Sequence, residues 1–385
     1  MCHMATKTAP FASNSGSKNE TDVFVIGGGP AGLAAAIAAR RKGFRVTVAD
    51  GAAPPIDKPC GEGMMPETQV ALRELGVTLP PGAGCCFRGI QFVQGSVRVA
   101  ADFPQGQGIG IRRPILHELL IQEAERRGAN LLWKTPVLGL DSASVQLPGR
   151  IVSVRWVIGA DGAGSRVRRW SGLEATVQRK QRSASRRHYR LRPWSEYAEI
   201  HWGPRSQAYV TPISDEEVCI VITAEKAEDV SFERALRDLR ELRERLIGAE
   251  LGSRERGAMT AMHSLRRVSR GNIALVGDAS GGVDAITGHG LQLAFRQARA
   301  LAEAMASGDL QAYEHKHRQL ARRPIWMGRL MLWLGRNAKL RVRALHAMQR
   351  RPELFARLLA FHVGHATLSD VLATSAQLGW RFLTA

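Results

Sequence analysis

Three glycines with a fixed spacing are the residues of this 385-residue chain whose chemistry is easiest to infer. Gly27, Gly29 and Gly32 form the pattern G-x-G-x-x-G. Between a strand and a helix, the first glycine permits a tight turn and the second lets backbone amides approach a pyrophosphate. The third lets the helix lie close to the strand. This spacing predicts a turn that binds a dinucleotide.

The residues around these glycines predict the elements that such a turn needs. The apolar residues 23–26 predict a buried parallel strand, and the alanine-rich residues 33–41 predict a helix. A second strand is expected over residues 45–49, and Asp50 follows it, where a carboxylate accepts hydrogen bonds from an adenosine ribose. Because these parts follow one another in the required order, we predict a dinucleotide site.

Two further turns contain glycine and aspartate after apolar runs. Asp161-Gly162 follows one run and Gly277-Asp278 follows the next, so both carboxylates can accept hydrogen bonds from ligand hydroxyls. A glycine-rich loop then leads into a helix that begins near Gly288 to Gly290. The amides and the positive dipole end of this helix are expected to face the ligand and to stabilise negative charge on it.

The proline-rich loop after Asp50 contains the unusual sequence Cys60-Gly61-Glu62-Gly63. Small residues beside a thiol and a carboxylate would let the backbone pass along a planar ring, although a turn with an incidental cysteine is the alternative. Arg113 precedes an amphipathic helix expected over residues 114–127. Its guanidinium suits a phosphate or the linker of a cofactor, and an exposed arginine at a helix start is the alternative.

The net charge of +19 indicates attraction to an anionic partner or a solvated basic surface. Residues 321–360 combine arginines with Trp326 and Trp333, which suggests peripheral contact with an anionic membrane. A helical cap packed on the catalytic domain, with its arginines in water, is the alternative. No nucleic-acid partner is expected, because no module that reads nucleic acid accompanies the charge.

The five cysteines show neither metal-ligand spacing nor an even disulfide framework, so we expect no metal and a reducing, cytoplasmic setting. They are Cys2, Cys60, Cys85, Cys86 and Cys219. The sequence suggests neither a signal peptide nor a membrane-spanning helix.

The motifs GGGPAG, GADGAGSRVR and GNIALVGDAS, the last followed by TGHG, together resemble the flavoprotein superfamily of aromatic hydroxylases and geranylgeranyl reductases. The resemblance covers residues 20–310 and implies a glutathione-reductase-like fold with FAD bound non-covalently. It places residues at the ADP half of FAD (Gly27, Gly29, Gly32, Asp50), near the linker (Arg113, Asp161), at the ribityl chain and pyrophosphate (Asp278) and by the isoalloxazine (Gly288, Gly290).

The resemblance leaves the reaction open. The Cys60 loop and the TGHG sequence look closest to the reductases, in which a cysteine faces the flavin, whereas RRHYRLRPW and AYVTPI look like presumed hydroxylases of phenolic lipids. His289 departs from both groups, which have Glu or Gln there. With an ordinary pKa near ~6.5, His289 can donate a proton or orient a substrate, and a structural histidine is the alternative.

Three hypotheses follow. The leading one is a monooxygenase that takes electrons from NADH or NADPH and hydroxylates a hydrophobic aromatic or polyketide-like substrate. The second is a reductase of isoprenoid C=C bonds in which Cys60 helps to protonate the substrate, and the third is a non-catalytic flavin-binding protein at a membrane surface. No second G-x-G-x-x-G lies between a strand and a helix, so the nicotinamide is expected to bind only transiently.

The expected fold is α/β, with an FAD-binding Rossmann domain, an inserted antiparallel-sheet substrate domain and C-terminal helices. The predicted division is residues 1–20 as a disordered lead-in, 21–80 with 100–170 and 262–310 as the FAD-binding domain, 81–99 with 171–261 as the substrate domain, and 311–385 as the helical region.

Overall fold

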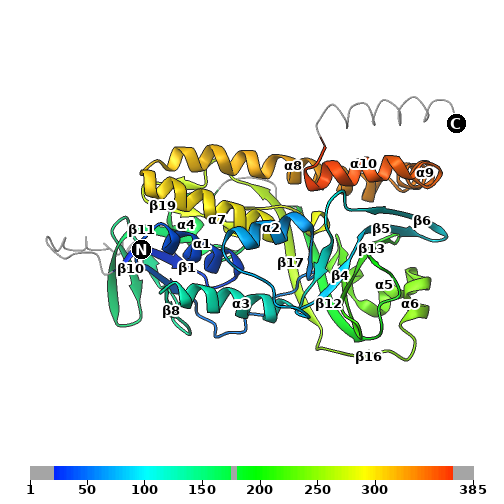
Figure 1. Cartoon of the computed structure of the whole chain (residues 1–385), viewed down its shortest axis with the longest axis horizontal. Coiled ribbons are helices and arrows are strands. Elements are labelled where there is room, and N and C mark those ends of the chain that lie inside the picture. Colours follow the sequence, from blue (N-terminus) through cyan, green and yellow to red (C-terminus); the bar gives the residue numbers. More distant parts are fainter. Residues whose placement is uncertain (1–20, 175–179, 367–385) are drawn as a thin grey trace, which may run out of the picture.

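The computed structural model describes residues 21–174 and 180–366. The predicted lead-in and the end of the predicted helical region, residues 367–385, lie outside the described residues. The described part confirms the predicted α/β fold: a parallel sheet with helices, a larger antiparallel sheet and C-terminal helices (Figure 1).

The parallel sheet has the strand order β18-β19-β11-β1-β2-β8, and β9 and β10 extend it beside β11. Strand β1 is central because its apolar residues are buried on both faces, as parallel sheets require. The strands are β1 (Thr21–Ile26), β2 (Val46–Ala49), β8 (Asn130–Leu132), β9 (Gly139–Leu140), β10 (Ser144–Leu147), β11 (Arg150–Gly159), β18 (Ser269–Arg270) and β19 (Ile273–Leu275).

Helices cover one face of this sheet, and a short helix packs on the other face, next to the β9–β10 hairpin. Apolar residues of α1, α2, α3 and α7 form one core with β1 and β2. These helices are α1 (Pro30–Arg41), α2 (Pro66–Glu74), α3 (Arg113–Arg126) and α7 (Gly290–Ser307), and the short helix on the opposite face is α4 (Arg166–Trp170).

The second sheet is mostly antiparallel, with the strand order β20-β17-β12-β15-β14-β13-β5-β6 and with β16 beside β12. Only β5 and β13 pair in parallel among its described strands. The strands are β5 (Gly89–Gln94), β6 (Val97–Asp102), β12 (Lys180–Arg190), β13 (Tyr197–Trp202), β14 (Ser206–Ser214), β15 (Glu217–Ala224), β16 (Glu250–Leu251), β17 (Arg256–Ser264) and β20 (Gly281–Gly282).

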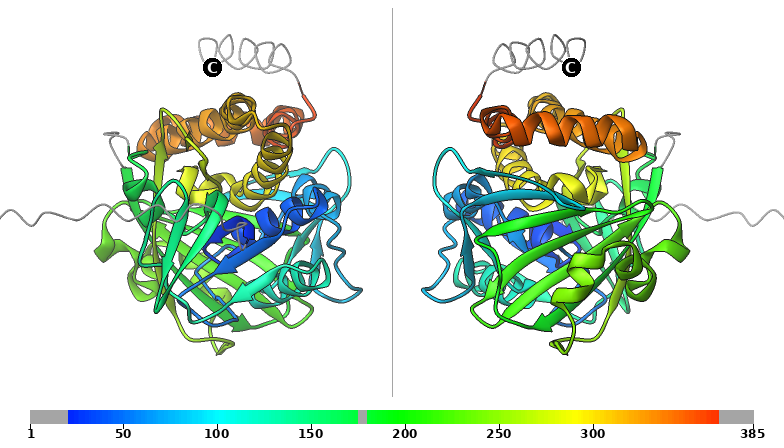
Figure 2. Two further views of the ribbon diagram at one scale, coloured as in Figure 1. Left: turned by 90° about the vertical axis from the view of Figure 1, so that its left-hand side faces the viewer. Right: turned by 90° about the vertical axis from the view of Figure 1, so that its right-hand side faces the viewer.

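Helices pack on both faces of the second sheet. The helices α5 (Phe232–Asp238) and α6 (Arg240–Arg245) pack on one face, and α8 (Leu310–Arg336), α9 (Ala338–Arg350) and α10 (Pro352–Val363) pack on the other. The side views show these last three helices, in orange and red, along one side of the molecule (Figure 2). A small sheet of β3 (Gly63–Met64), β7 (Gly108–Gly110) and β4 (Cys85–Phe87) lies close to the second sheet at β14.

Two element boundaries differ from what the sequence pattern predicts. Residues 90–99 read as one strand, but the chain reverses at Gly95, which has a φ of +56°, and forms the β5–β6 hairpin. Residues 232–247 read as one helix, but Leu239 leaves the helical conformation between α5 and α6. The break allows Leu239 and Leu242 to be buried together against the sheet. The division into domains at the residues given above stays a prediction.

Candidate active site

The first turn, residues 27–32, is shaped by contacts that only glycine permits. Gly27 has a φ of +111°, and a Cβ there would lie 2.5 Å from the Ala160 carbonyl oxygen. A Cβ at Gly32 would overlap the Gly27 carbonyl oxygen. A Cβ at Gly29, in contrast, would meet no described atom within 4 Å. Gly27 and Gly32 are therefore needed for packing, whereas Gly29 borders open space.

Asp50 at the end of β2 fixes the first turn from the side. Its Oδ2 accepts from the Gly28 amide at 2.8 Å, and its Oδ1 accepts from the Ala52 amide at 2.8 Å. The sequence reasoning missed His117, which donates from Nε2 to the Gly28 carbonyl at 2.8 Å. Burial lowers the pKa of His117, so its ring is neutral. No local signal marks His117, because it meets the turn from α3.

The second turn, residues 160–165, contains the predicted Asp161 and Gly162. Asp161 Oδ2 accepts from the first two amides of α4, those of Arg166 at 2.7 Å and Val167 at 3.2 Å. Asp161 Oδ1 is buried and has no hydrogen-bond partner among the described residues. Gly162 has a φ of +82°, which the turn requires. The unpaired oxygen marks a place for a donor from a ligand.

The third turn, residues 277–280, contains the predicted Gly277 and Asp278. A Cβ at Gly277 would lie 2.7 Å from the Ala31 side chain, so this turn lies against the start of α1. Asp278 is exposed. Buried Arg168 joins the second and third turns, because it donates to the carbonyl of Ala163 at 2.7 Å and to that of Ala279 at 3.1 Å. All three turns therefore meet at one place.

The groups at this place fit FAD. Helix α1 begins after Gly29 with no side-chain cap and no acid in its first turn, so its amides are free for a pyrophosphate. The carboxylates of Asp50, Asp161 and Asp278 can accept from the hydroxyls of ribose and the ribityl chain. Arg113 donates its amide to Glu62 at 2.9 Å, and its buried Nε has no partner among the described residues.

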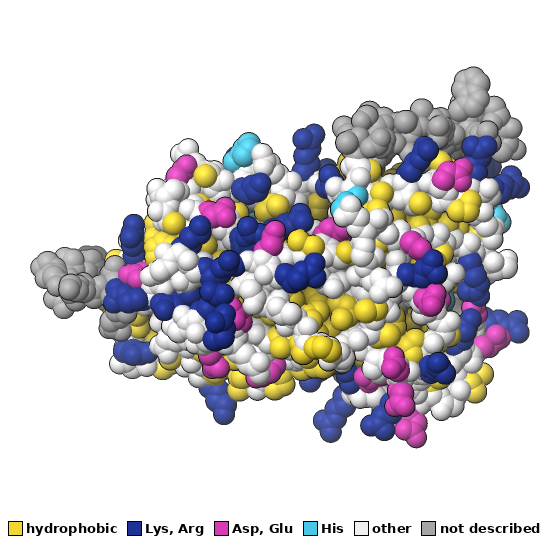
Figure 3. Space-filling model, in the orientation of Figure 1, with side chains coloured by type: hydrophobic (Ala, Val, Ile, Leu, Met, Phe, Trp, Pro, Cys, Tyr) yellow, Lys and Arg dark blue, Asp and Glu magenta, His cyan; other side chains and the backbone are white. Residues whose placement is uncertain are grey.

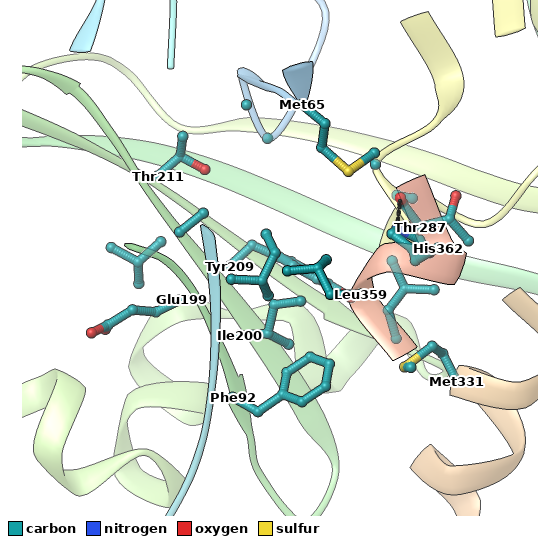
Figure 4. Close-up of a pocket in the computed structure, with 18 of the residues that line it drawn as sticks. Met65, Phe92, Glu199, Ile200, Tyr209, Thr211, Thr287, Met331, Leu359 and His362 are labelled. Atoms are coloured by element: carbon teal, nitrogen blue, oxygen red, sulfur yellow. Dashed lines mark hydrogen bonds between the residues drawn. The ribbon is translucent and has the colours of Figure 1, made fainter. Parts of the chain in front are cut away.

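An apolar pocket lies between the second sheet and helices α8 and α10 (Figure 4). Strands β5, β13, β14 and β15 contribute one wall, and Met327, Met331, Phe355 and Leu359 contribute the opposite wall. Three glycines from two loops, Gly61, Gly63 and Gly288, form part of the lining. The polar residues in the lining are Glu199, Tyr209, Thr211, Thr223, Thr287 and His362.

The structure places Cys60 immediately before this glycine edge. Cys60 is partly exposed, and its Sγ accepts a hydrogen bond from the Glu62 amide at 3.4 Å. Cys219, which is buried, directs its thiol toward the Cys60 carbonyl at 3.6 Å. Burial raises the pKa of Cys219 well above its ordinary value, so this second thiol stays protonated. The catalytic role of Cys60 stays a prediction.

His289 and Gly290 lie at the start of α7, and Gly288 precedes them with a φ of +64°. The His289 ring is buried and donates from Nε2 to the His362 carbonyl at 3.2 Å. His289 is not among the residues that line the pocket, whereas His362 is. His362 comes from α10, and its ring centroid lies 4.3 Å from that of His289. Sequence reasoning missed His362, because no motif links the TGHG loop to α10.

The fold and the three converging turns define a flavin-dependent oxidoreductase. The profile of the FAD binding domain family matches residues 20–317, so the chain belongs to this family and is an FAD-dependent oxidoreductase. The predicted resemblance to reductases and hydroxylases that bind FAD is confirmed. The third hypothesis, a non-catalytic protein, is therefore set aside.

The chain is similar to two curated reductases. It is 28% identical over 319 residues to menaquinone reductase of Mycobacterium tuberculosis, covering 76% of this chain and 78% of that protein. It is 27% identical to digeranylgeranylglycerophospholipid reductase of Methanothrix thermoacetophila, covering 77% and 83% of the two chains. A flavoprotein/dehydrogenase from Cytophaga hutchinsonii shares the fold at a TM-score of 0.77 and 21% identity, covering 93% of this chain and 99% of that one.

Among the described helices, none is both long and apolar enough to cross a bilayer. Lys and Arg side chains are spread between acidic ones on the face shown in Figure 3. On α8, Trp326 and Trp333 are 42% and 52% exposed, while Met327 and Met331 of the same helix face the pocket. The helix thus packs as a cap over the sheet. Contact of its outer face with a membrane stays a prediction.

Proposed function

We propose that this oxidoreductase is a reductase that saturates a C=C bond in the polyprenyl chain of an apolar substrate. The observation that carries the proposal is the pocket, whose apolar walls suit a hydrocarbon chain and whose glycine edge leaves room beside a flat ring. The names of the two reductases above support it, because menaquinone and digeranylgeranylglycerophospholipid both contain polyprenyl chains.

The protein's own part in this reaction is to orient the chain and to supply a proton. Reduced FAD, when bound, is a source of hydride for one carbon of the double bond. Cys60 Sγ–H is the proposed proton donor to the other carbon, because Cys60 precedes pocket-lining Gly61 and its sulfur accepts from the Glu62 amide. Solvent returns the proton to the thiolate afterwards, since Cys60 is partly exposed. The apolar walls exclude other water from the double bond.

We infer that NADH or NADPH reduces the flavin in a transient encounter. The inference rests on the sequence, in which no second G-x-G-x-x-G stands between a strand and a helix. A stopped-flow comparison of the two nicotinamides under anaerobic conditions, which follows bleaching of the flavin absorbance, would identify the donor.

The second candidate is the monooxygenase, which is the leading hypothesis from the sequence. The same pocket supports it, because oxygen chemistry on a flavin also needs a dry, apolar chamber for an aromatic substrate. Both reactions use the apolar walls and the glycine edge, and they differ at Cys60, whose proton only the proposed reductase uses.

An anaerobic turnover experiment separates the two candidates. The purified FAD-bound protein is incubated with NADPH or NADH and with geranylgeranyl diphosphate or a menaquinone. The masses of the products are then measured by mass spectrometry. We expect a gain of two hydrogens per double bond without oxygen. A gain of one oxygen atom, seen only in air and with a phenolic lipid, would overturn the reductase and support the monooxygenase.

A further inference from the structure

Glu62 occupies an unusual backbone conformation between two pocket-lining glycines. Its φ is +58°, in the left-handed region that residues other than glycine rarely adopt. Gly61 and Gly63 line the pocket, whereas the Glu62 side chain is buried on the other side of the loop. A strained conformation persists only where the surroundings hold it, so the contacts of Glu62 need an explanation.

Three groups hold the Glu62 carboxylate. Oε1 accepts from Arg186 at 3.0 Å and from the Arg113 amide at 2.9 Å, and Oε2 lies 2.6 Å from His188 Nε2. The side chains of Glu62, Arg186 and His188 are all fully buried. Arg186 also pairs with Asp57 at 2.9 Å. The carboxylate is therefore tied to β12 and to the start of α3.

The direction of the His188 hydrogen bonds follows from the two groups beside its Nδ1. One is Ser253, whose Oγ lies 2.6 Å away and can donate to it, and the other is Arg112. Arg112 NH1 lies 2.6 Å from His188 Nδ1, and a guanidinium only donates. His188 Nδ1 must therefore accept, and Nε2 must carry the hydrogen that it donates to Glu62. Arg112 is held in turn by Glu217 at 3.0 Å. Arg112 thus donates to His188, and His188 donates to Glu62.

The fixed Glu62 side chain also determines where the Glu62 amide points, which is toward Cys60. With the carboxylate fixed, the Glu62 amide donates to Cys60 Sγ at 3.4 Å. We propose that Glu62 is a positioning residue: its anchor on His188 and Arg186 holds the turn that directs this amide at the Cys60 sulfur and so raises the reactivity of the thiol. The thiolate is the reactive form of cysteine, and a hydrogen bond to the sulfur favours it. Only the effect of Glu62 on turnover rests on the proposed function.

The test measures how fast iodoacetamide alkylates Cys60 in the full-length, FAD-bound protein, by mass spectrometry of the Cys60 peptide. Glu62→Gln removes the charge, and Glu62→Gly removes the carboxylate while leaving the left-handed turn accessible. His188→Gln breaks the same contact from β12. We expect all three to slow alkylation by at least about threefold near pH 7 and to approach the wild-type rate near pH 9.5, which is above the ordinary cysteine pKa of about 8.5.

Glu67→Gln is the matched control. Glu67 is also buried and also pairs with a histidine, His365, at 3.0 Å, but it lies on α2 beyond the loop. Equal rates for the Glu62 variants and this control near pH 7 would overturn the proposal, as would faster alkylation at both pH values, which indicates only a loosened loop. If Glu62→Gln does not fold, His188→Gln gives the same comparison. Because alkylation needs no substrate, a failed reductase assay leaves the result valid.

Discussion

His289 and His362 hold each other's chain segments across the end of the pocket. His289 Nε2 lies 3.2 Å from the His362 carbonyl oxygen, and His362 Nε2 lies 2.9 Å from the carbonyl oxygen of Thr287. Since a carbonyl only accepts, both rings donate from Nε2. The two imidazoles thereby join α10 to the loop that precedes α7, beside Gly288 in the pocket lining.

This pair predicts a loss of stability in acid. Burial lowers the pKa of His289 to about 4 and lowers that of His362 well below 6.5. Between pH 6.5 and about pH 4 the unfolded chain therefore binds protons that the folded chain excludes, so unfolding becomes easier as the pH falls through this window. We expect His289 to lower the free energy of unfolding by about 2 kcal/mol between pH 7 and pH 5, and His362 to change it in the same direction, measured by urea titration.

His289→Gln should remove the contribution of one ring to the pH dependence of the free energy of unfolding. The control is His317→Gln, because burial also lowers the pKa of His317 to about 4, but its Nε2 contacts Ser280 at 2.9 Å under the third turn. Both variants should flatten the stability curve. Only His289→Gln should also increase proteolysis within α10 at pH 7. Equal proteolysis of the two variants would contradict the fastening role of the histidine pair.

Gly29→Ala should weaken FAD binding without harming the protein alone. Its φ of −73° suits any residue, and no described atom lies within 4 Å of the added methyl group. The methyl group would instead enter the space where a pyrophosphate approaches the amides. We expect the melting temperature of the apoprotein to stay within about 2 °C and the FAD affinity to fall at least about tenfold. Fluorescence titration with FAD measures the affinity.

Gly32→Ala is the companion variant, because its methyl group would overlap the Gly27 carbonyl oxygen. It should lower the melting temperature of the apoprotein as well as the FAD affinity. If Gly29→Ala lowers the apoprotein melting temperature as much as Gly32→Ala does, then the space beside Gly29 is not a ligand site.

Asp161→Asn tests the unpaired oxygen of the second turn. An asparagine can still accept from the first two amides of α4 through its side-chain oxygen, but it presents an amide where Asp161 Oδ1 offers an acceptor. We expect the FAD affinity to fall at least about tenfold and the stability to change by less than about 1 kcal/mol. Asp309→Asn is the control, because Asp309 caps α8 by accepting from the amides of Gln311 and Ala312. This control should bind FAD normally.

Much of the FAD site could be predicted because its signals are local. The turns at Gly27, Asp161 and Gly277 each join a strand to a helix or loop within about ten residues, so type and spacing reveal them. The meeting of the three turns follows from strand order, because β1, β11 and β19 are neighbours in the sheet.

The remaining site residues depend on contacts that no short pattern encodes. His188 meets Glu62 across 126 residues of chain, and His362 meets Thr287 across 75. His117 reaches the first turn across 89 residues. Each is a single histidine on an otherwise ordinary strand or helix, and the sequence shows only that it is polar. The partner of each becomes known only when the tertiary packing is known.

Cys60→Ala should separate proton supply from binding. Alanine removes the Sγ–H and leaves Gly61 and Gly63 to line the pocket. We expect unchanged FAD affinity and unchanged anaerobic bleaching of the flavin by the nicotinamide, with a loss of at least about hundredfold in saturation of the double bond, as for other general acids.

Cys86→Ala is the control, because Cys86 is exposed on β4 and is not part of the pocket lining. If Cys60→Ala turns over as fast as this control, Cys60 is not the proton donor. The next candidate to test is Tyr209, because burial raises its pKa to about 12 and keeps its hydroxyl protonated.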